Sequence, residues 1–136
     1  MQALDTNFII ALTDPRPDYR QQALVKLDVS QEIVVPCICY GEAWHGLTLG
    51  HPEKTARKRK LWQDTILPLR VLWLNDETKN TFSDLCWQLS RQGTPIPTND
   101  IWIAALCLQH DAELVTRDHD FKHVPDLRIR MEDVNS

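Results

Sequence analysis

The sequence lacks the patterns that take a protein into or across a membrane. No uncharged run in its 136 residues approaches the ~20 strongly apolar residues that a membrane-spanning helix needs. The opening residues, Met1 to Asp5, contain an acid and no basic segment, so no signal peptide is expected. We therefore predict a soluble, cytoplasmic protein with no membrane partner.

Cysteine and histidine patterns typical of zinc sites or disulfide frameworks are also missing. The sequence has four cysteines but no C-x-x-C pair, and its five histidines have no zinc-ligand spacing. Each cysteine lies in an apolar stretch, where a free thiol behaves as a small hydrophobic side chain. We expect four reduced core residues: Cys37, Cys39, Cys86 and Cys107.

An excess of positive charge is missing as well. The formal net charge is −4, which argues against indiscriminate binding of nucleic acid through total charge. The sequence nevertheless contains one basic cluster: Lys54, Arg57, Lys58, Arg59 and Lys60. Two interpretations of this cluster stay open, a surface that contacts RNA phosphates and an ordinary solvated helix face.

The chain has no internal repeat and no long linker, and its length suits one domain over residues 1–136. Its apolar pattern predicts strands at 3–5, 33–35, 69–74, 113–116 and, at the edge, 127–130. It predicts helices at 8–12, 19–27, 38–49, 53–67, 77–92 and 99–110, the last with Thr98 as its N-cap. This alternation indicates a three-layer α/β/α fold with a mostly parallel central sheet of four to five strands.

Three acidic residues stand alone in long stretches that carry no other charge. Each is the only charged residue of its stretch: Asp5 in residues 1–13, Glu42 in 33–50 and Asp100 in 95–109. These stretches are apolar enough to lie in the core, and burying an ionised carboxylate without a partner is very costly. A divalent cation is the simplest partner for three such charges.

The predicted order of elements brings the acids to one edge of the sheet. Asp5 ends the first strand, Asp118 follows the fourth, and Asp100 lies in the first turn of the preceding helix. Open parallel sheets bind ligands beyond the carboxyl ends of their strands, where the strand order reverses. If the first and fourth strands are neighbours, these three carboxylates share a pocket, and Glu42 can reach its rim. Because clustered carboxylates repel, we predict a hard cation, Mg²⁺ or Mn²⁺, suited to phosphoryl transfer.

Each acid also has a simpler interpretation. Asp5 could cap the helix that follows it, and Asp100 could complement a helix dipole. Asp118 has charged neighbours that are typical of a solvated loop. Glu42 lies among apolar residues, so a capping role does not explain it. Together, the four acids favour the metal site.

Four segments occur in the order and spacing of a known family: Leu4–Asn7, Gly41–Gly46, Asn99–Ala105 and Leu114–Phe121. With Gly93–Pro97 ahead of the third, they resemble the signature blocks of PIN-domain ribonucleases, specifically the VapC-type toxins of bacterial toxin–antitoxin pairs. The resemblance spans almost the whole chain. It implies a PIN-like fold and a Mg²⁺-dependent endoribonuclease, with Mn²⁺ able to substitute, acting on tRNA or another structured RNA.

The resemblance also implies roles for particular residues and partners. The metal-binding and catalytic acids would be Asp5, Glu42, Asp100 and Asp118, supported by Thr6, Asn7 and Thr116. The chain would form a homodimer, and a small antitoxin would place its tail in the active-site groove, with a larger assembly of the two also open. Many relatives carry Asn and one more residue before the Asp-Phe pair, whereas Asp118 and Asp120 are both acidic here. We predict Asp118 as the fourth ligand and Asp120 as a supporting residue.

Two other functions compete with the nuclease. A phosphatase of the haloacid dehalogenase type would need an Asp-x-Asp pair after the first strand, but the second position of that pair is Asn7. A catalytically silent module that binds RNA or a partner protein would have no reason to keep crowded like charges. Both alternatives are therefore less favoured than the metal-dependent ribonuclease.

Overall fold

The computed structural model describes residues 1–134, which form a five-stranded sheet in the order β3-β2-β1-β4-β5. All four pairings between neighbouring strands are parallel. The strands are β1 (Gln2–Leu4), β2 (Ile33–Pro36), β3 (Arg70–Leu72), β4 (Glu113–Thr116) and β5 (Ile129–Met131). The prediction of a parallel sheet is confirmed, and β1 and β4 are neighbours.

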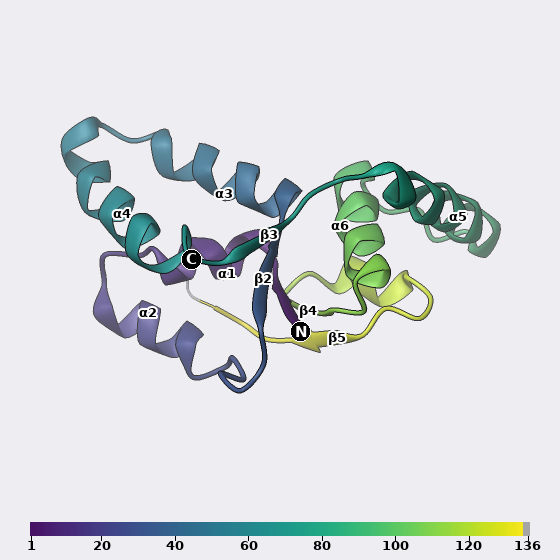
Figure 1. Cartoon of the computed structure of the whole chain (residues 1–136), viewed down its shortest axis with the longest axis horizontal. Helices are drawn as coiled ribbons and strands as arrows, with labels where there is room; N and C mark the ends of the chain where they lie inside the picture. Colours follow the sequence, from purple (N-terminus) through teal and green to yellow (C-terminus); the bar gives the residue numbers. More distant parts are fainter. Residues whose placement is uncertain (135–136) are drawn as a thin grey trace.

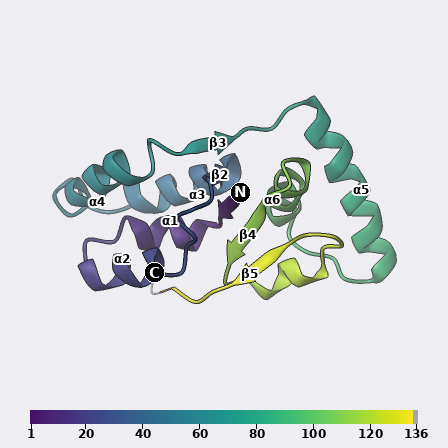
Figure 2. The same ribbon diagram turned by 60° about the horizontal axis from the view of Figure 1, so that its bottom comes forward.

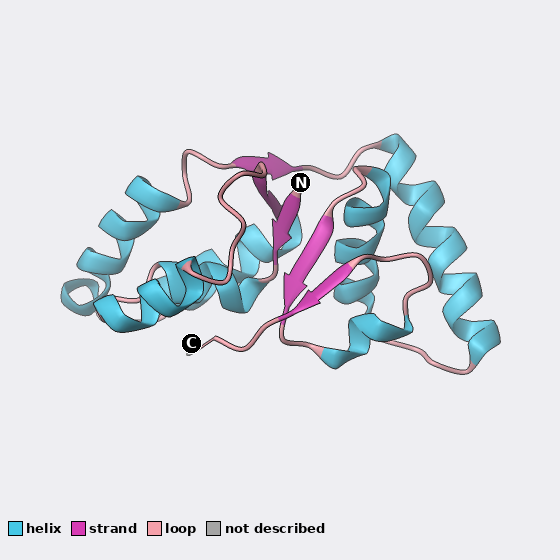
Figure 3. Ribbon diagram, turned by 90° about the horizontal axis from the view of Figure 1, so that it is seen from below, coloured by secondary structure: helices cyan, strands magenta, loops and turns pink. Residues whose placement is uncertain are grey.

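Six α-helices within residues 1–134 cover the sheet, and Figures 1 and 2 show them in two groups. Helices α1–α4 lie on one side of the strands, and α5 and α6 lie on the other (Figure 3). The helices are α1 (Thr6–Leu12), α2 (Pro17–Leu24), α3 (Cys37–Thr48), α4 (Pro52–Thr65), α5 (Asp76–Gln92) and α6 (Thr98–Gln109). In this part of the chain, no helix is both long and apolar enough to cross a membrane.

The strand order reverses at β1. The chain first builds outward from β1 to β2 and β3, then crosses through α5 and α6 to β4 on the opposite side of β1. Leu4 pairs with Val115, so the residues that follow, Asp5 and Thr116, lie at the same edge of the sheet. This edge is the place where open parallel sheets bind ligands.

The central strands are buried on both faces, as their continuous apolar runs predict. Ala3, Leu4, Val34 and Val35 are all fully buried. Residues 103–107 of α6 are also buried, which anchors that helix against the sheet. The first turn of α6, with Asp100, is thereby held at the edge where β1 and β4 end.

Helix α5 has well-defined ends. Asn75 accepts hydrogen bonds from the backbone of Glu77 and Thr78, and the Thr78 side chain completes a capping box. At the other end, Gly93 has φ 72°, a left-handed conformation that glycine adopts without strain. Leu85 faces the core, as its helical spacing predicts.

Several predicted boundaries were wrong. Thr98 is not the N-cap of α6; Pro97 holds that position, and Thr98 is the first helical residue. Helix α2 spans 17–24 rather than 19–27, because proline is favoured in a first turn, where its missing N–H is not needed. Strand β3 spans 70–72 rather than 69–74, and strand β5 spans 129–131 rather than 127–130. The 3₁₀ helix η1 (His119–His123) was not predicted.

The cysteines follow their prediction in part. All four are free, and Cys39 and Cys107 are fully buried. Cys37 and Cys86 are only half-buried and pack against the outside of the core, so the prediction of core residues is wrong for these two.

Candidate metal centre

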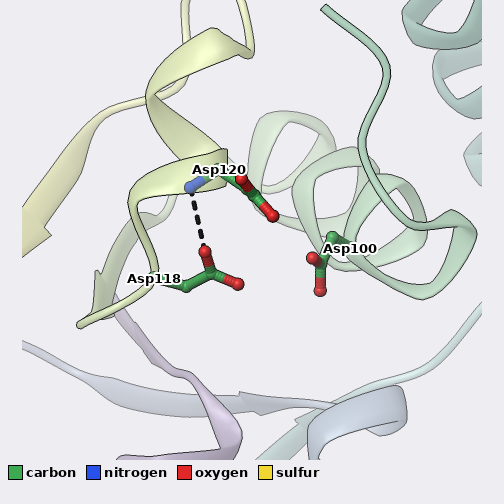
Figure 4. A group of neighbouring side chains, drawn as sticks. All are labelled: Asp100, Asp118 and Asp120. Atoms are coloured by element: carbon green, nitrogen blue, oxygen red, sulfur yellow. Dashed lines mark hydrogen bonds between the residues drawn. The ribbon is translucent and has the colours of Figure 1, made fainter.

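Three carboxylates meet beyond the end of β4. Asp100 comes from the first turn of α6, Asp118 from the turn after β4, and Asp120 from η1 (Figure 4). Each offers an oxygen atom, and these three atoms lie within 4.8 Å of one another. The Asp118 side chain also accepts a hydrogen bond from the Asp120 backbone N–H at 2.9 Å, which holds the two residues together.

Asp5 is adjacent to this group and nearly buried, with 7% of its surface exposed. Its Oδ1 accepts from the Thr6 backbone N–H at 2.8 Å, so it does cap α1, as the simpler interpretation predicts. Its Oδ2 accepts from the Thr116 hydroxyl at 2.6 Å. Thr116 Oγ1 in turn accepts from the Asp118 backbone N–H at 3.0 Å. Thr116 therefore links Asp5 to the turn that carries Asp118.

Glu42 departs from the sequence prediction. Its segment was expected to lie in the core, but Glu42 is on the exposed face of α3, while Ala43 is buried. A run without charge can form a helix with one face in solvent, and the run alone does not reveal which residues occupy that face. The Thr6 hydroxyl donates to Glu42 at 3.2 Å, which places this carboxylate at the rim beside α1.

The acids interact electrostatically as one group. The pKa of Asp100 is raised from its ordinary value of 3.8 to about 6. Burial is the largest cause, followed by the charges of four carboxylates: Asp118, Asp5, Glu42 and Asp120. The structure thus brings four other acids close enough to act on Asp100, although the five carboxylates come from four separate segments of the chain.

Two cysteines that the site prediction omitted lie beside Asp5. The Cys39 thiol donates to Asp5 Oδ1, with sulfur and oxygen 3.6 Å apart. Burial, and then the charge of Asp5, raises the pKa of the Cys39 thiol well above its ordinary value. The same two causes, in the same order, raise the pKa of Cys107 to about 12. A sequence signal existed for Cys39, which lies three residues before Glu42 on one helix.

Of the predicted supporting residues, Thr6 and Thr116 contact site carboxylates directly. Asn7 faces a different neighbour, because its Oδ1 accepts from the Arg117 guanidinium at 3.2 Å. Arg117 also donates to the backbone oxygen of Val134 at 3.2 Å. Asn7 therefore ties the start of α1 to the turn after β4, a role that sequence reasoning did not identify.

The basic cluster lies along α4, and four of its five residues are exposed. Lys60 pairs with Asp64 at 3.0 Å, and the Arg59 guanidinium lies 5.4 Å from the ring centre of Trp44. Lys58 is half-buried.

The tryptophans differ in burial. Trp62 is buried, consistent with core packing, and Trp44 packs against it with ring centres 5.2 Å apart. Trp73 and Trp87 are largely exposed. Trp73 lines an open groove with Tyr40 and Trp44, on the α3–α4 side of the molecule.

The donor set of the acidic cluster fits a hard divalent cation. Asp100, Asp118 and Asp120 supply carboxylate oxygens, which Mg²⁺ and Mn²⁺ prefer, and the half-exposed site leaves room for water. Burial, and then the negative charges of four neighbouring carboxylates, raise the pKa of Asp100, and such a cation would neutralise those charges. The Cys39 sulfur does not belong to this donor set, because the thiol contacts Asp5 from inside the core.

Comparison with known proteins identifies the family. Residues 3–127 match the family model of the PIN domain. Ribonuclease VapC1 of Haemophilus influenzae strain R2866 is 30% identical over 127 residues, which cover 92% of each chain. The chain therefore belongs to the PIN-domain family and, within it, groups with the VapC-type ribonucleases, the toxins of toxin–antitoxin pairs.

Solved structures agree with this assignment. VapBC-1 from nontypeable Haemophilus influenzae superimposes with a TM-score of 0.72 at 29% identity over 96% of each chain. VapBC2 from Rickettsia felis, solved with a DNA fragment from its promoter, has a TM-score of 0.81. That match covers 97% of this chain and 98% of the other at 23% identity, and it supports the fold alone.

Proposed function

We propose that this chain is a Mg²⁺-dependent endoribonuclease and the toxin of a toxin–antitoxin pair, with residues 1–136 as one nuclease domain. The observation that carries the proposal is the convergence of five carboxylates at the point where the strand order reverses. Because these carboxylates are partly buried and carry like charge, the group needs a counter-ion. The metal dependence of the family explains why the chain has such a group of acids.

Each acid of the cluster would have a role in binding the cation. Asp5, Asp100, Asp118 and Glu42 would hold the cation, with Asp120 as an additional ligand at the exposed side. Bound Mg²⁺ supplies a dication that neutralises a phosphate and favours ionisation of water at neutral pH. Thr116 keeps Asp5 oriented through its 2.6 Å hydrogen bond, and Thr6 holds Glu42 at the rim. Asp120 can add a ligand oxygen beside that of Asp118, because both carboxylates reach the cluster.

The proposed substrate is an RNA strand, with tRNA or another structured RNA favoured. The site is open to solvent, as Asp120 and Glu42 are exposed, so a large substrate can reach it. The basic residues of α4 are proposed contacts for phosphates outside the cleaved bond: Lys54, Arg57, Lys58, Arg59 and Lys60. Mn²⁺ should substitute for Mg²⁺, since both accept oxygen ligands in octahedral geometry.

The proposed partners are a second copy of the chain and a small antitoxin. Support for the antitoxin comes from similar solved structures, VapBC-1 at 29% identity and FitAcB from Neisseria gonorrhoeae at 25% identity. We place the pair in the cytoplasm, in keeping with four free thiols.

A phosphatase of the haloacid dehalogenase type has less support. Asn7 stands where that chemistry needs a second aspartate, and its side chain is engaged by Arg117. A catalytically silent module is also less favoured, because no cation of the chain forms an ion pair with the cluster of Asp100, Asp118 and Asp120 among the described residues.

The test is cleavage of a total tRNA pool by the purified chain. We expect cutting with Mg²⁺ or Mn²⁺ and none with EDTA. Asp5→Asn and Asp100→Asn should each lower the rate by at least about 10³-fold, because each removes a carboxylate from the proposed cation site. Asn also caps helices well, so Asp5→Asn should keep the fold.

The control is Asp84→Asn, which changes the same group on the exposed face of α5 and should cut at the wild-type rate. In cells, wild-type expression should arrest growth, and the Asp5→Asn variant should not. Cutting that persists in EDTA, or full activity of either site variant, would refute the proposed function.

A further inference from the structure

Three donors from three different segments hold the carboxylate of Asp5. Thr6 donates its backbone N–H to Oδ1, and Thr116 donates its hydroxyl to Oδ2. The third donor is the Cys39 thiol on α3, which also approaches Oδ1. The Cys39 thiol is not part of the acidic cluster, because Cys39 is fully buried and its thiol lies on the core side of Asp5.

The three donors are not equivalent mechanically. The Thr6 N–H is the next amide in the chain, so it moves with Asp5 and restrains the carboxylate only locally. Thr116 and Cys39 come from β4 and α3, so each fixes one oxygen relative to a distant element. Without the thiol, Oδ1 keeps only its local donor, and the Thr116 hydroxyl alone ties the carboxylate to a distant element.

We propose that Cys39 is a positioning residue, whose S–H holds the Asp5 carboxylate in the orientation that receives the cation. The proposal rests on the proposed function, since it assumes that Asp5 takes part in cation binding. Cys39 also sits one helical turn before Glu42 on α3. Its hydrogen bond therefore fixes the spacing between Asp5 and the helix that carries the rim carboxylate.

Cys107 provides a matched control. It is the same residue type, fully buried and beside the same carboxylate, but it belongs to α6. Among residues 1–134, Cys39 is the cysteine whose sulfur donates to Asp5, and no such bond is formed by Cys107. Removing either sulfur leaves a small cavity in the same core, but only removal of the Cys39 sulfur takes from Oδ1 its hydrogen bond to a distant element.

The experiment measures Mn²⁺ binding to the full chain by isothermal titration calorimetry. Cys39→Ala should bind Mn²⁺ about fivefold more weakly, the loss expected for one weak hydrogen bond to a charged group. Cys39→Ser keeps a donor on the same Cβ and should recover at least about half of that loss. Cys107→Ala should bind Mn²⁺ as the wild type does, while losing thermal stability in EDTA to a similar extent as Cys39→Ala.

Cleavage provides a second readout. The Mn²⁺ concentration for half-maximal cutting should rise in Cys39→Ala, whereas the rate at saturating Mn²⁺ should stay close to the wild-type rate. If Cys39→Ala and Cys107→Ala bind Mn²⁺ equally well, or if Ser behaves as Ala does, the thiol only fills space and the inference is wrong. A wild-type chain that binds no Mn²⁺ would overturn the proposed function itself, which separates the two failures.

Discussion

At Asp100, burial and the like charges of four neighbouring carboxylates act in the same direction and raise the pKa. In the metal-free chain its carboxyl group has a pKa of about 6, against an ordinary value of 3.8. Between these two values the folded state binds more protons than the unfolded state does. The stability that this group contributes is therefore fully present below about pH 4 and is lost as the pH rises through about 6. A bound cation would replace the proton, so cation affinity should weaken below the same pH.

The raised pKa of Asp100 predicts that Asp100→Asn stabilises the metal-free protein at neutral pH. The gain in the free energy of unfolding should be about 1 kcal/mol at pH 7, reduced from the full shift because solvent screens a half-buried group. At pH 4 the gain should nearly vanish, since wild-type Asp100 is then protonated. Urea denaturation in EDTA at both pH values measures the difference, with Asp84→Asn as the control. A gain that is equal at both pH values would contradict a raised pKa at Asp100.

Among the helices, the positions of their first residues decide where the site carboxylates stand. Helix α1 starts at the Asp5 cap, α6 starts just before Asp100, and η1 starts at the Asp118 cap. Each start places a carboxylate beside backbone N–H groups at one edge of the sheet, where it is favoured by the local dipole. The helix starts therefore serve both local capping and the gathering of acids.

The two glycines Gly46 and Gly93 should respond in opposite ways to alanine. Gly93 ends α5 with φ 72°, so a Cβ there is strained, and Gly93→Ala should lower stability by about 1 kcal/mol. Gly46 lies within α3, and a Cβ added there would meet nothing within 4 Å, so Gly46→Ala should gain about 0.5–1 kcal/mol. Thermal unfolding would then shift by about 3 °C per kcal/mol in each direction. Shifts of the same sign would contradict the left-handed end of α5.

Across the whole molecule, the order of strands in the sheet creates the site. Asp5 and Thr116 are 111 positions apart in the chain and meet because β1 and β4 are neighbours. The crossover through α5 and α6 then delivers Asp100 to the same edge. The site consequently exists only in the complete fold, and a ligand that binds it must stabilise that fold as a whole.

Binding of Mn²⁺ should therefore raise the melting temperature of the wild-type chain. At a hundredfold excess over its dissociation constant, Mn²⁺ should contribute about 3 kcal/mol to the free energy of unfolding. EDTA should reverse the shift, and Asp100→Asn should largely abolish it, whereas Asp84→Asn should keep it. Differential scanning fluorimetry across a Mn²⁺ series measures this. An equal shift in Asp100→Asn and the wild type would place the cation elsewhere.

Local patterns in the chain were enough to predict the architecture. Continuous apolar strands such as residues 33–35 alternate with amphipathic helices, and this pattern depends on neighbours in the chain, which a sequence displays directly. The isolation of Asp5, Glu42 and Asp100 in uncharged stretches, the predicted place of Asp118 after the fourth strand, and then the resemblance to a family indicated these four acids. Whether these four are the catalytic set stays a prediction that the cleavage assay decides.

The contacts between side chains, in contrast, became visible only in the folded molecule. The fold turned Glu42 outward on α3, brought Asp120 into the cluster through η1, and set the Cys39 thiol against Asp5. These contacts depend on the order of the strands and on which helix face packs inward. Both are settled by burial across the whole molecule, so no local run of residues contains that information.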